Sequence, residues 1–133
     1  MRIGFIGLGV MGAPMAGHLT AGGNTLVTCL NRSPLPEGLV ATVAQNPCAV
    51  ARDSDIVILM LPDTPDVERV LMGADGVIAG LNPGTLVIDM STISPIATAQ
   101  FAEAVRAAGG SYLDAPVSGG VSREIDIRGG LIL

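Results

Sequence analysis

The sequence predicts an α/β domain built on a doubly wound parallel sheet, with helices on both faces in three αβα layers. Short apolar runs alternate with longer helical patterns, which is typical of parallel strands joined by crossover helices. The runs are nearly continuous rather than alternating apolar and polar, as expected for strands covered on both faces. Because 49% of the 133 residues are hydrophobic but only 2% are aromatic, the core must be made mainly of aliphatic side chains.

The first strand and the first helix are the most clearly marked elements. Residues 2–7 form an apolar run that predicts a strand, and Met11, Met15 and Leu19 then recur every four residues along one helical stripe. Glycine is common just beyond the last turn of a helix, so the pair Gly22-Gly23 predicts where this helix ends.

Later segments continue the alternation of strands and helices. A helix is predicted over residues 65–72, and another begins at Ser94-Pro95, a good N-cap and first-turn pair, and ends at Gly109-Gly110. Residues 33–38 are less regular, because two prolines and a glycine oppose a long helix there. The other predicted strands cover residues 25–30, 55–61, 85–90 and 111–114, with a weaker one at 41–44.

Right-handed crossovers place these strands in the order 3-2-1-4-5-6, which is a Rossmann-type sheet. In such a sheet the ligand crevice lies at the carboxyl ends of the first and fourth strands, where the strand order reverses. We therefore look for a binding site in the segments that follow those strands.

A glycine motif stands at the expected place. Gly7-Leu8-Gly9-Val10-Met11-Gly12 matches G-x-G-x-x-G, follows an apolar strand directly and opens a helix, which are the conditions that make the motif meaningful. Gly7 makes the tight turn, Gly9 lets the backbone approach a pyrophosphate, and Gly12 lets helix and strand pack closely. All six residues are therefore predicted to bind a dinucleotide; the alternative is a glycine-rich turn without a ligand.

The end of the second strand indicates which dinucleotide is preferred. NAD-specific sites usually carry an acidic residue there, which accepts hydrogen bonds from the ribose 2′-hydroxyl. This chain has Asn31, Arg32 and Ser33 instead, and a guanidinium can pair with a 2′-phosphate. These residues predict NADP(H), with NAD(H) as the alternative, although an arginine in a loop can also simply face solvent.

Other candidate residues lie at neighbouring strand ends. Leu61 and Pro62 leave the fourth strand at the switch point and are predicted to line the cofactor path.

Hydroxyls and backbone N–H groups after the fifth and sixth strands could hold a carboxylate, although such residues are more often caps and turns. Likewise, Asp89 and Asp114 are expected to cap the following turns rather than act as bases. The predicted substrate residues are Ser91, Thr92, Ser118, Gly119 and Gly120, and Thr92 is counted as a cofactor contact too.

Charge and composition argue against several other classes of function. The net charge is −5 and no basic cluster is present, so neither nucleic acid nor an anionic membrane surface is an expected partner. No apolar stretch approaches the roughly 20 residues of a membrane span, and no signal peptide is recognisable, so a cytoplasmic location is expected. The two cysteines lack metal-ligand spacing, so no metal site is predicted.

Three separated segments resemble the β-hydroxyacid dehydrogenases, a family that includes 3-hydroxyisobutyrate dehydrogenase. Residues 5–16 are similar to the family's cofactor motif, Asp89-Met90-Ser91-Thr92 to its fifth-strand motif, and residues 114–120 to its substrate-binding motif. The resemblance implies an oxidoreductase that transfers hydride between a nicotinamide cofactor and a small 3-hydroxy acid or semialdehyde. The first motif and Gly73-Ala74-Asp75-Gly76 are most similar to the branch that reduces tartronate semialdehyde (2-hydroxy-3-oxopropionate). Imine reductases and 6-phosphogluconate dehydrogenases share the first motif, but residues 114–120 fit them less well.

The resemblance covers residues 1–121, which we expect to form the NADP-binding domain, whereas residues 122–133 form a divergent tail. Family members continue into a helical domain whose lysine handles the hydroxyl proton, but this sequence contains no lysine. We therefore expect a chain truncated before that domain, with no catalytic residue to assign and little dehydrogenase activity alone; a full-length protein could be a homo-oligomer. The alternatives are a non-enzymatic NADP-binding or sensing module and an unstable remnant.

Overall fold

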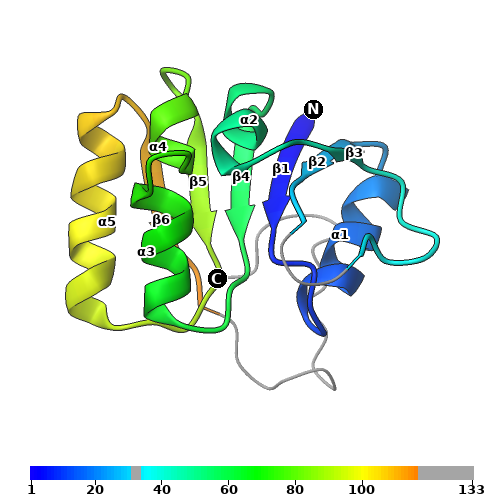
Figure 1. The fold of residues 1–133 in the computed structure, drawn as a ribbon, viewed down its shortest axis with the longest axis horizontal. Coiled ribbons are helices and arrows are strands. Elements are labelled where there is room, and N and C mark those ends of the chain that lie inside the picture. The colour runs from blue at the N-terminus through cyan, green and yellow to red at the C-terminus, as the bar shows by residue number, and fades with distance from the viewer. Residues whose placement is uncertain (31–33, 117–133) are drawn as a thin grey trace.

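The computed structural model describes residues 1–30 and 34–116, and in this part of the chain six parallel strands form one sheet (Figure 1). The strand order is β3-β2-β1-β4-β5-β6, as the sequence predicts. Every strand except β6 is shorter than its apolar run, because the ends of the runs continue into turns. The strands are β1 (Arg2–Ile6), β2 (Thr25–Thr28), β3 (Thr42–Val43), β4 (Ile56–Leu59), β5 (Leu86–Asp89) and β6 (Ser111–Asp114).

Strand register brings the carboxyl ends of four strands level with one another. Ile6 at the end of β1 pairs with Leu59 of β4, which in turn pairs with Asp89 of β5. Asp89 is paired with Asp114 at the end of β6. The segments after these strands therefore begin in one row along one edge of the sheet, and this row positions the candidate site.

In the described part of the chain five helices connect the strands, and two of them were not predicted. The unpredicted helices are the two shortest, with six and four residues, so neither is long enough to show a helical period. Helix α2 does carry a local signal, because Asn46 caps it by accepting a 2.9 Å hydrogen bond from the Ala49 amide and Pro47 is its first residue. The helices are α1 (Gly12–Ala21), α2 (Pro47–Arg52), α3 (Thr64–Met72), α4 (Val77–Gly80) and α5 (Pro95–Ala107).

The predicted helix ends are confirmed. Helix α1 ends at Gly22-Gly23, where Gly23 has a φ of +91° and the Asn24 amide bonds back to the Leu19 carbonyl. Helix α5 ends in the same way before Gly109, whose φ is +92°. Glycine adopts these left-handed conformations without a Cβ penalty, so both pairs return the chain to the next strand. Among the helices of the described part, none combines the length and the apolar character that crossing a bilayer requires.

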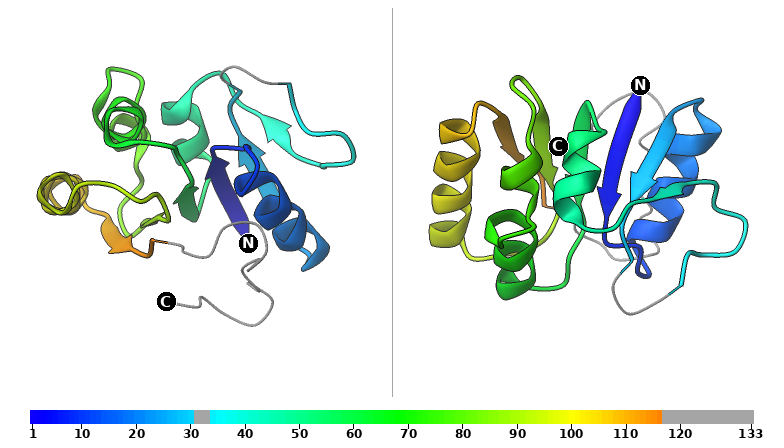
Figure 2. Two further views of the ribbon diagram at one scale, coloured as in Figure 1. Left: turned by 90° about the horizontal axis from the view of Figure 1, so that it is seen from below. Right: turned by 45° about the horizontal axis from the view of Figure 1, so that its top comes forward.

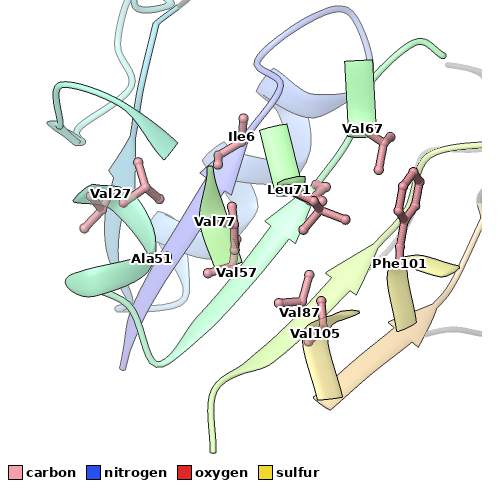
Figure 3. Close-up of a cluster of buried hydrophobic side chains, with 12 residues drawn as sticks. Ile6, Val27, Ala51, Val57, Val67, Leu71, Val77, Val87, Phe101 and Val105 are labelled. Atoms are coloured by element: carbon pink, nitrogen blue, oxygen red, sulfur yellow. The ribbon is translucent and has the colours of Figure 1, made fainter. Parts of the chain in front are cut away.

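The helices cover the two faces of the sheet unequally. Helices α2 to α5 pack on one face and α1 on the other, as the view from below shows (Figure 2). On the first face, side chains such as Leu71 and Phe101 pack against Val57 and Val87 of the central strands (Figure 3). On the second face, Met15 of α1 belongs to a separate buried cluster. The result is the predicted three-layer arrangement, in which β1, β2, β4 and β5 are largely buried and the edge strands β3 and β6 are more exposed.

Candidate cofactor-binding site

A cavity of about 730 Å³ opens beyond the carboxyl ends of β1, β2 and β4, where the crevice is predicted. This volume lies within the roughly 300–1,000 Å³ that is typical of small-molecule and cofactor sites. The whole glycine motif lines it, together with Leu61 and Pro62. The other described lining residues are Ile6, Cys29, Leu30, Pro34, Gln45, Asn46, Pro47, Met60, Asp66, Arg69, Val70, Gly73, Ala74 and Asp75.

The three motif glycines differ in the space around them. Gly7 has a φ of +110°, and a Cβ there would overlap the Met60 carbonyl oxygen. A Cβ on Gly12 would overlap the Gly7 carbonyl oxygen, so α1 can start this close to β1 only with glycine at that position. Nothing lies within 4 Å of a Cβ built on Gly9, which is exposed. Gly7 and Gly12 therefore shape the turn, whereas Gly9 leaves open space above it.

The start of α1 leaves backbone donors at this turn. The first residues of any helix have N–H groups without partners inside the helix. The N-cap residue Met11 has no side-chain capping hydrogen bond, and the Ala13 amide is the first to bond back, to the Gly9 carbonyl at 3.0 Å. Amides in this arrangement suit an anion such as a pyrophosphate, and the helix dipole favours negative charge at the same end.

The segment after β4 forms the wall opposite the turn. The Leu61 Cδ2 atom lies 3.2 Å from the position of a Cβ on Gly7, so Leu61 packs directly against the turn. The Leu61 amide donates a 2.9 Å hydrogen bond to the Ser91 Oγ atom, which holds the wall to the end of β5. Leu61 and Pro62 thus line the cavity, and their contact with a cofactor stays a prediction.

The predicted substrate residues that follow β5 differ in exposure. Ser91 is buried, with only 1% of its surface exposed, and its hydroxyl accepts the Leu61 bond. Thr92 is exposed, and neither residue belongs to the described lining of the cavity. Ser91 therefore fixes backbone in this structure, while Thr92 presents its side chain to solvent.

Several predicted residues lie outside the described part of the chain. They include Asn31, Arg32 and Ser33, although Leu30 and Pro34 on either side of them line the cavity. They also include Ser118, Gly119 and Gly120, which follow the last described residue after β6. The predictions for these six residues stay predictions.

Residues of α3 and of the loop after β3 are cavity residues that the sequence analysis missed. Arg69 of α3 pairs with Asp66 at 2.7 Å, and Asp75 lies beyond the same helix. Gln45 and Asn46 belong to the loop between β3 and α2 and line the same cavity. The cap signal at Asn46 marks the start of a helix at a strand end, and it could have drawn attention to this side of the crevice.

A buried carboxylate organises the ends of β5 and β6. Asp89 is fully buried; its Oδ1 atom accepts a 3.0 Å hydrogen bond from the Ser91 amide and its Oδ2 atom a 2.6 Å bond from the Tyr112 hydroxyl. Asp89 therefore caps the following turn, as predicted. Burial, this hydrogen bond and the charge of Asp89 together raise the pKa of Tyr112. The pKa of Asp114 is also raised, first by desolvation and then by the charge of Asp89.

Comparison with known proteins places the chain in a family of NAD-binding domains. Residues 2–126 match the model of a family described as the NAD binding domain of 6-phosphogluconate dehydrogenase. The 2-hydroxy-3-oxopropionate reductase of Escherichia coli (strain K12) is 46% identical over 136 residues, which cover 99% of this chain and 45% of the reductase.

Two solved structures share the fold. The 3-hydroxyisobutyrate dehydrogenase of Mycobacterium tuberculosis, solved with L-serine, is 35% identical with a TM-score of 0.79, over 91% of this chain and 42% of the dehydrogenase. A protein named Psf3, solved with NADP⁺ and 2-OPP, is 31% identical with a TM-score of 0.81, over 90% of this chain and 44% of Psf3. The chain spans less than half the length of each of these three relatives.

Proposed function

Because the chain belongs to the family described as the NAD binding domain of 6-phosphogluconate dehydrogenase, we propose that the cavity beside its glycine turn binds NADP(H), with NAD(H) as the weaker ligand. The observation that carries this proposal is the contrast among the motif glycines. Gly7 and Gly12 have no room for a Cβ, whereas Gly9 faces open space on the wall of a cavity of about 730 Å³. A pyrophosphate needs this combination of a tight turn and free access to backbone amides.

The choice of NADP(H) over NAD(H) rests on Arg32. The segment from Leu30 to Pro34 contains this arginine and no carboxylate, so nothing in it repels a 2′-phosphate. Leu30 and Pro34, the described residues on either side of this arginine in the sequence, both line the cavity. Psf3, whose structure has the same fold, was solved with NADP⁺.

Calorimetric titration of the 133-residue chain with NADPH and with NADH tests both parts of the proposal. We expect NADPH to bind more tightly, and Arg32→Ala to weaken NADPH binding about tenfold or more while affecting NADH less, since a hydrogen bond to a charged group is lost. Arg106→Ala is the matched control, because Arg106 is exposed on α5 and its Nε bonds to the Ala102 carbonyl. Absence of heat with either nucleotide would reject the site itself.

For the protein that contains this domain, we propose hydride transfer between the cofactor and a small 3-hydroxy acid or semialdehyde. Thr92, Ser91 and the segment with Ser118, Gly119 and Gly120 would contribute donors for the substrate carboxylate. A hydroxyl that accepts one hydrogen bond still has a proton to donate, so Ser91 can hold Leu61 and contribute a donor. The support comes from the position of Ser91 and Thr92 directly after β5 and from the relatives that act on such compounds.

A second candidate function, for these 133 residues taken alone, is a non-catalytic NADP-binding module, because they contain no lysine. Without a general acid/base, hydride transfer slows by about two to four orders of magnitude. Mixing the chain with NADPH and tartronate semialdehyde, and following the absorbance of the reduced nicotinamide, separates the two functions. Turnover supports the enzyme, whereas tight NADPH binding without turnover supports the binding module.

A further inference from the structure

The Leu61 side chain packs against the glycine turn at Gly7. The Met60 carbonyl and the Leu61 side chain fill the space into which a Cβ of Gly7 would project. The Met60 amide also bonds to the Ile6 carbonyl at 2.9 Å, so this segment continues the β1–β4 pairing up to the turn. A displacement of Leu61 therefore changes both the turn and the cavity wall.

The Leu61 amide is held by a side chain from the segment that follows β5. Backbone pairing between the ends of β4 and β5 includes the bond from the Met90 amide to the Leu59 carbonyl, at 2.8 Å. Beyond that bond, the Ser91 Oγ atom accepts the Leu61 amide at 2.9 Å, across 30 residues of sequence. The serine hydroxyl thus extends the strand pairing to the residue that faces the glycine turn.

Ser91 is itself held by the buried carboxylate of Asp89, which also accepts a hydrogen bond from the half-buried Tyr112. Asp89 accepts the Ser91 amide at 3.0 Å with one carboxylate oxygen and the Tyr112 hydroxyl at 2.6 Å with the other. A buried carboxylate is costly unless donors satisfy it, so Tyr112 and the Ser91 amide fix the orientation of Asp89. Hydrogen bonds to an ionised group are also the stronger kind, and they restrict the Ser91 backbone accordingly.

We propose that Tyr112 and Asp89 are positioning residues for cofactor binding, which act through Ser91 on the Leu61 amide. Tyr112 lies on β6 and is not in the described lining of the cavity, so it acts at a distance. The three bonds connect the strand that leads into residues 114–120 to the wall beside the glycine turn. This inference rests on the proposed cofactor function, and it adds a mechanical connection between the substrate-side strand and the cofactor loop.

Affinity measurements on variants test the connection. We expect Ser91→Ala to weaken NADPH binding about three- to tenfold, because the Leu61 amide loses its acceptor, and Tyr112→Phe to weaken it about two- to fivefold. Asp89→Asn should also weaken binding. Should it fail to fold, Tyr112→Phe removes the bond between Tyr112 and Asp89 while keeping the aromatic ring.

Ser54→Ala is the matched control for a buried serine hydroxyl. Ser54 has 2% of its surface exposed, donates a 2.6 Å hydrogen bond to the Val50 carbonyl and lies just before β4, away from the cavity. It should lose thermal stability as Ser91→Ala does, but its affinity for NADPH should stay within twofold of the parent chain. The inference would be overturned if NADPH affinity were equal in Ser54→Ala, Ser91→Ala and Tyr112→Phe. The hydrogen bonds that connect Tyr112, Asp89, Ser91 and Leu61 would then have a purely structural role.

A spectroscopic readout separates positioning from general stability. Tyr112 is the single tyrosine of the chain, so labelling tyrosine with ¹³C at Cζ gives one NMR resonance. NADPH should shift this resonance in the parent chain and in Ser54→Ala, but not in Ser91→Ala at saturating NADPH. No shift in the parent chain despite measured binding would overturn the inference alone, whereas no binding to the parent chain would overturn the proposed function and the inference together.

Discussion

The Tyr112 hydroxyl donates a 2.6 Å hydrogen bond to the Asp89 carboxylate, which is fully buried at the end of β5. The bond joins neighbouring strands through their side chains and runs diagonally across the register, because Tyr112 lies opposite Val87 and Asp114 lies opposite Asp89. It also places a phenol beside two carboxylates, so ionising that phenol would add a third negative charge at one edge of the sheet. Two measurable pH effects follow from this arrangement.

The first concerns alkaline titration of Tyr112. Its pKa is raised by burial, by the bond to Asp89 and by the charges of Asp89 and Asp114, so the folded state prefers the neutral phenol. The stabilisation is fully present below the unfolded pKa of about 10 and is lost as pH rises above it. Ultraviolet absorbance should detect no tyrosinate at about pH 11 until the protein unfolds. A fully reversible titration near pH 10 in folded protein would contradict this prediction.

The second concerns Asp114, whose pKa is raised by desolvation and by Asp89. The folded state favours the neutral carboxyl, so its contribution is present below about pH 4 and is lost as pH rises through the native pKa. Asp114→Asn should therefore raise the melting temperature at about pH 7, and the gain should shrink near pH 3. Glu68→Gln, an exposed change on α3, should show no such pH-dependent gain. A loss of stability at pH 7 in Asp114→Asn would contradict the assignment.

The glycine motif gives a prediction that separates folding from binding. A Cβ on Gly9 has open space around it, so Gly9→Ala should leave the melting temperature nearly unchanged. The same methyl stands where a pyrophosphate must approach, so NADPH affinity should fall about tenfold or more. Gly17→Ala is the control: it also has open space, lies within α1, and should gain about 0.5–1 kcal/mol of stability with unchanged affinity. Unchanged affinity in Gly9→Ala would argue against phosphates at this turn.

Most of the fold could be predicted because the apolar runs are local and the crossover rule then fixes their order. The strand order and the ends of α1 and α5 follow from patterns within a few residues, such as Ser94-Pro95 and Gly22-Gly23. Helices α2 and α4 were missed because periodicity needs more than one or two turns to be visible. For α2, the Asn46-Pro47 cap was the only local signal.

The site could be predicted only where it is continuous in sequence. The glycine motif is one continuous segment with its own signature. Arg69 and Gln45 lie in two other connections between strands, and only the folding of the chain brings them to the cavity. The bond between Ser91 and Leu61 depends on strand register and on a side-chain orientation that no local pattern contains. Asp89 was correctly expected to cap its turn, but its second partner, Tyr112, comes from a different strand.

Cofactor binding should be visible in the stability of the chain itself. A ligand that binds only the folded state, present at a hundred times its Kd, adds about 2.7 kcal/mol to the free energy of unfolding. For a domain of this size that corresponds to a rise of roughly 10 °C in melting temperature, which differential scanning calorimetry measures directly. NADPH should produce the larger rise and NADH the smaller one at equal concentration. Gly9→Ala keeps the fold but obstructs the turn, so it should lose most of this rise in melting temperature. A rise that persists unchanged in Gly9→Ala would mean that the nucleotide binds somewhere other than the glycine turn.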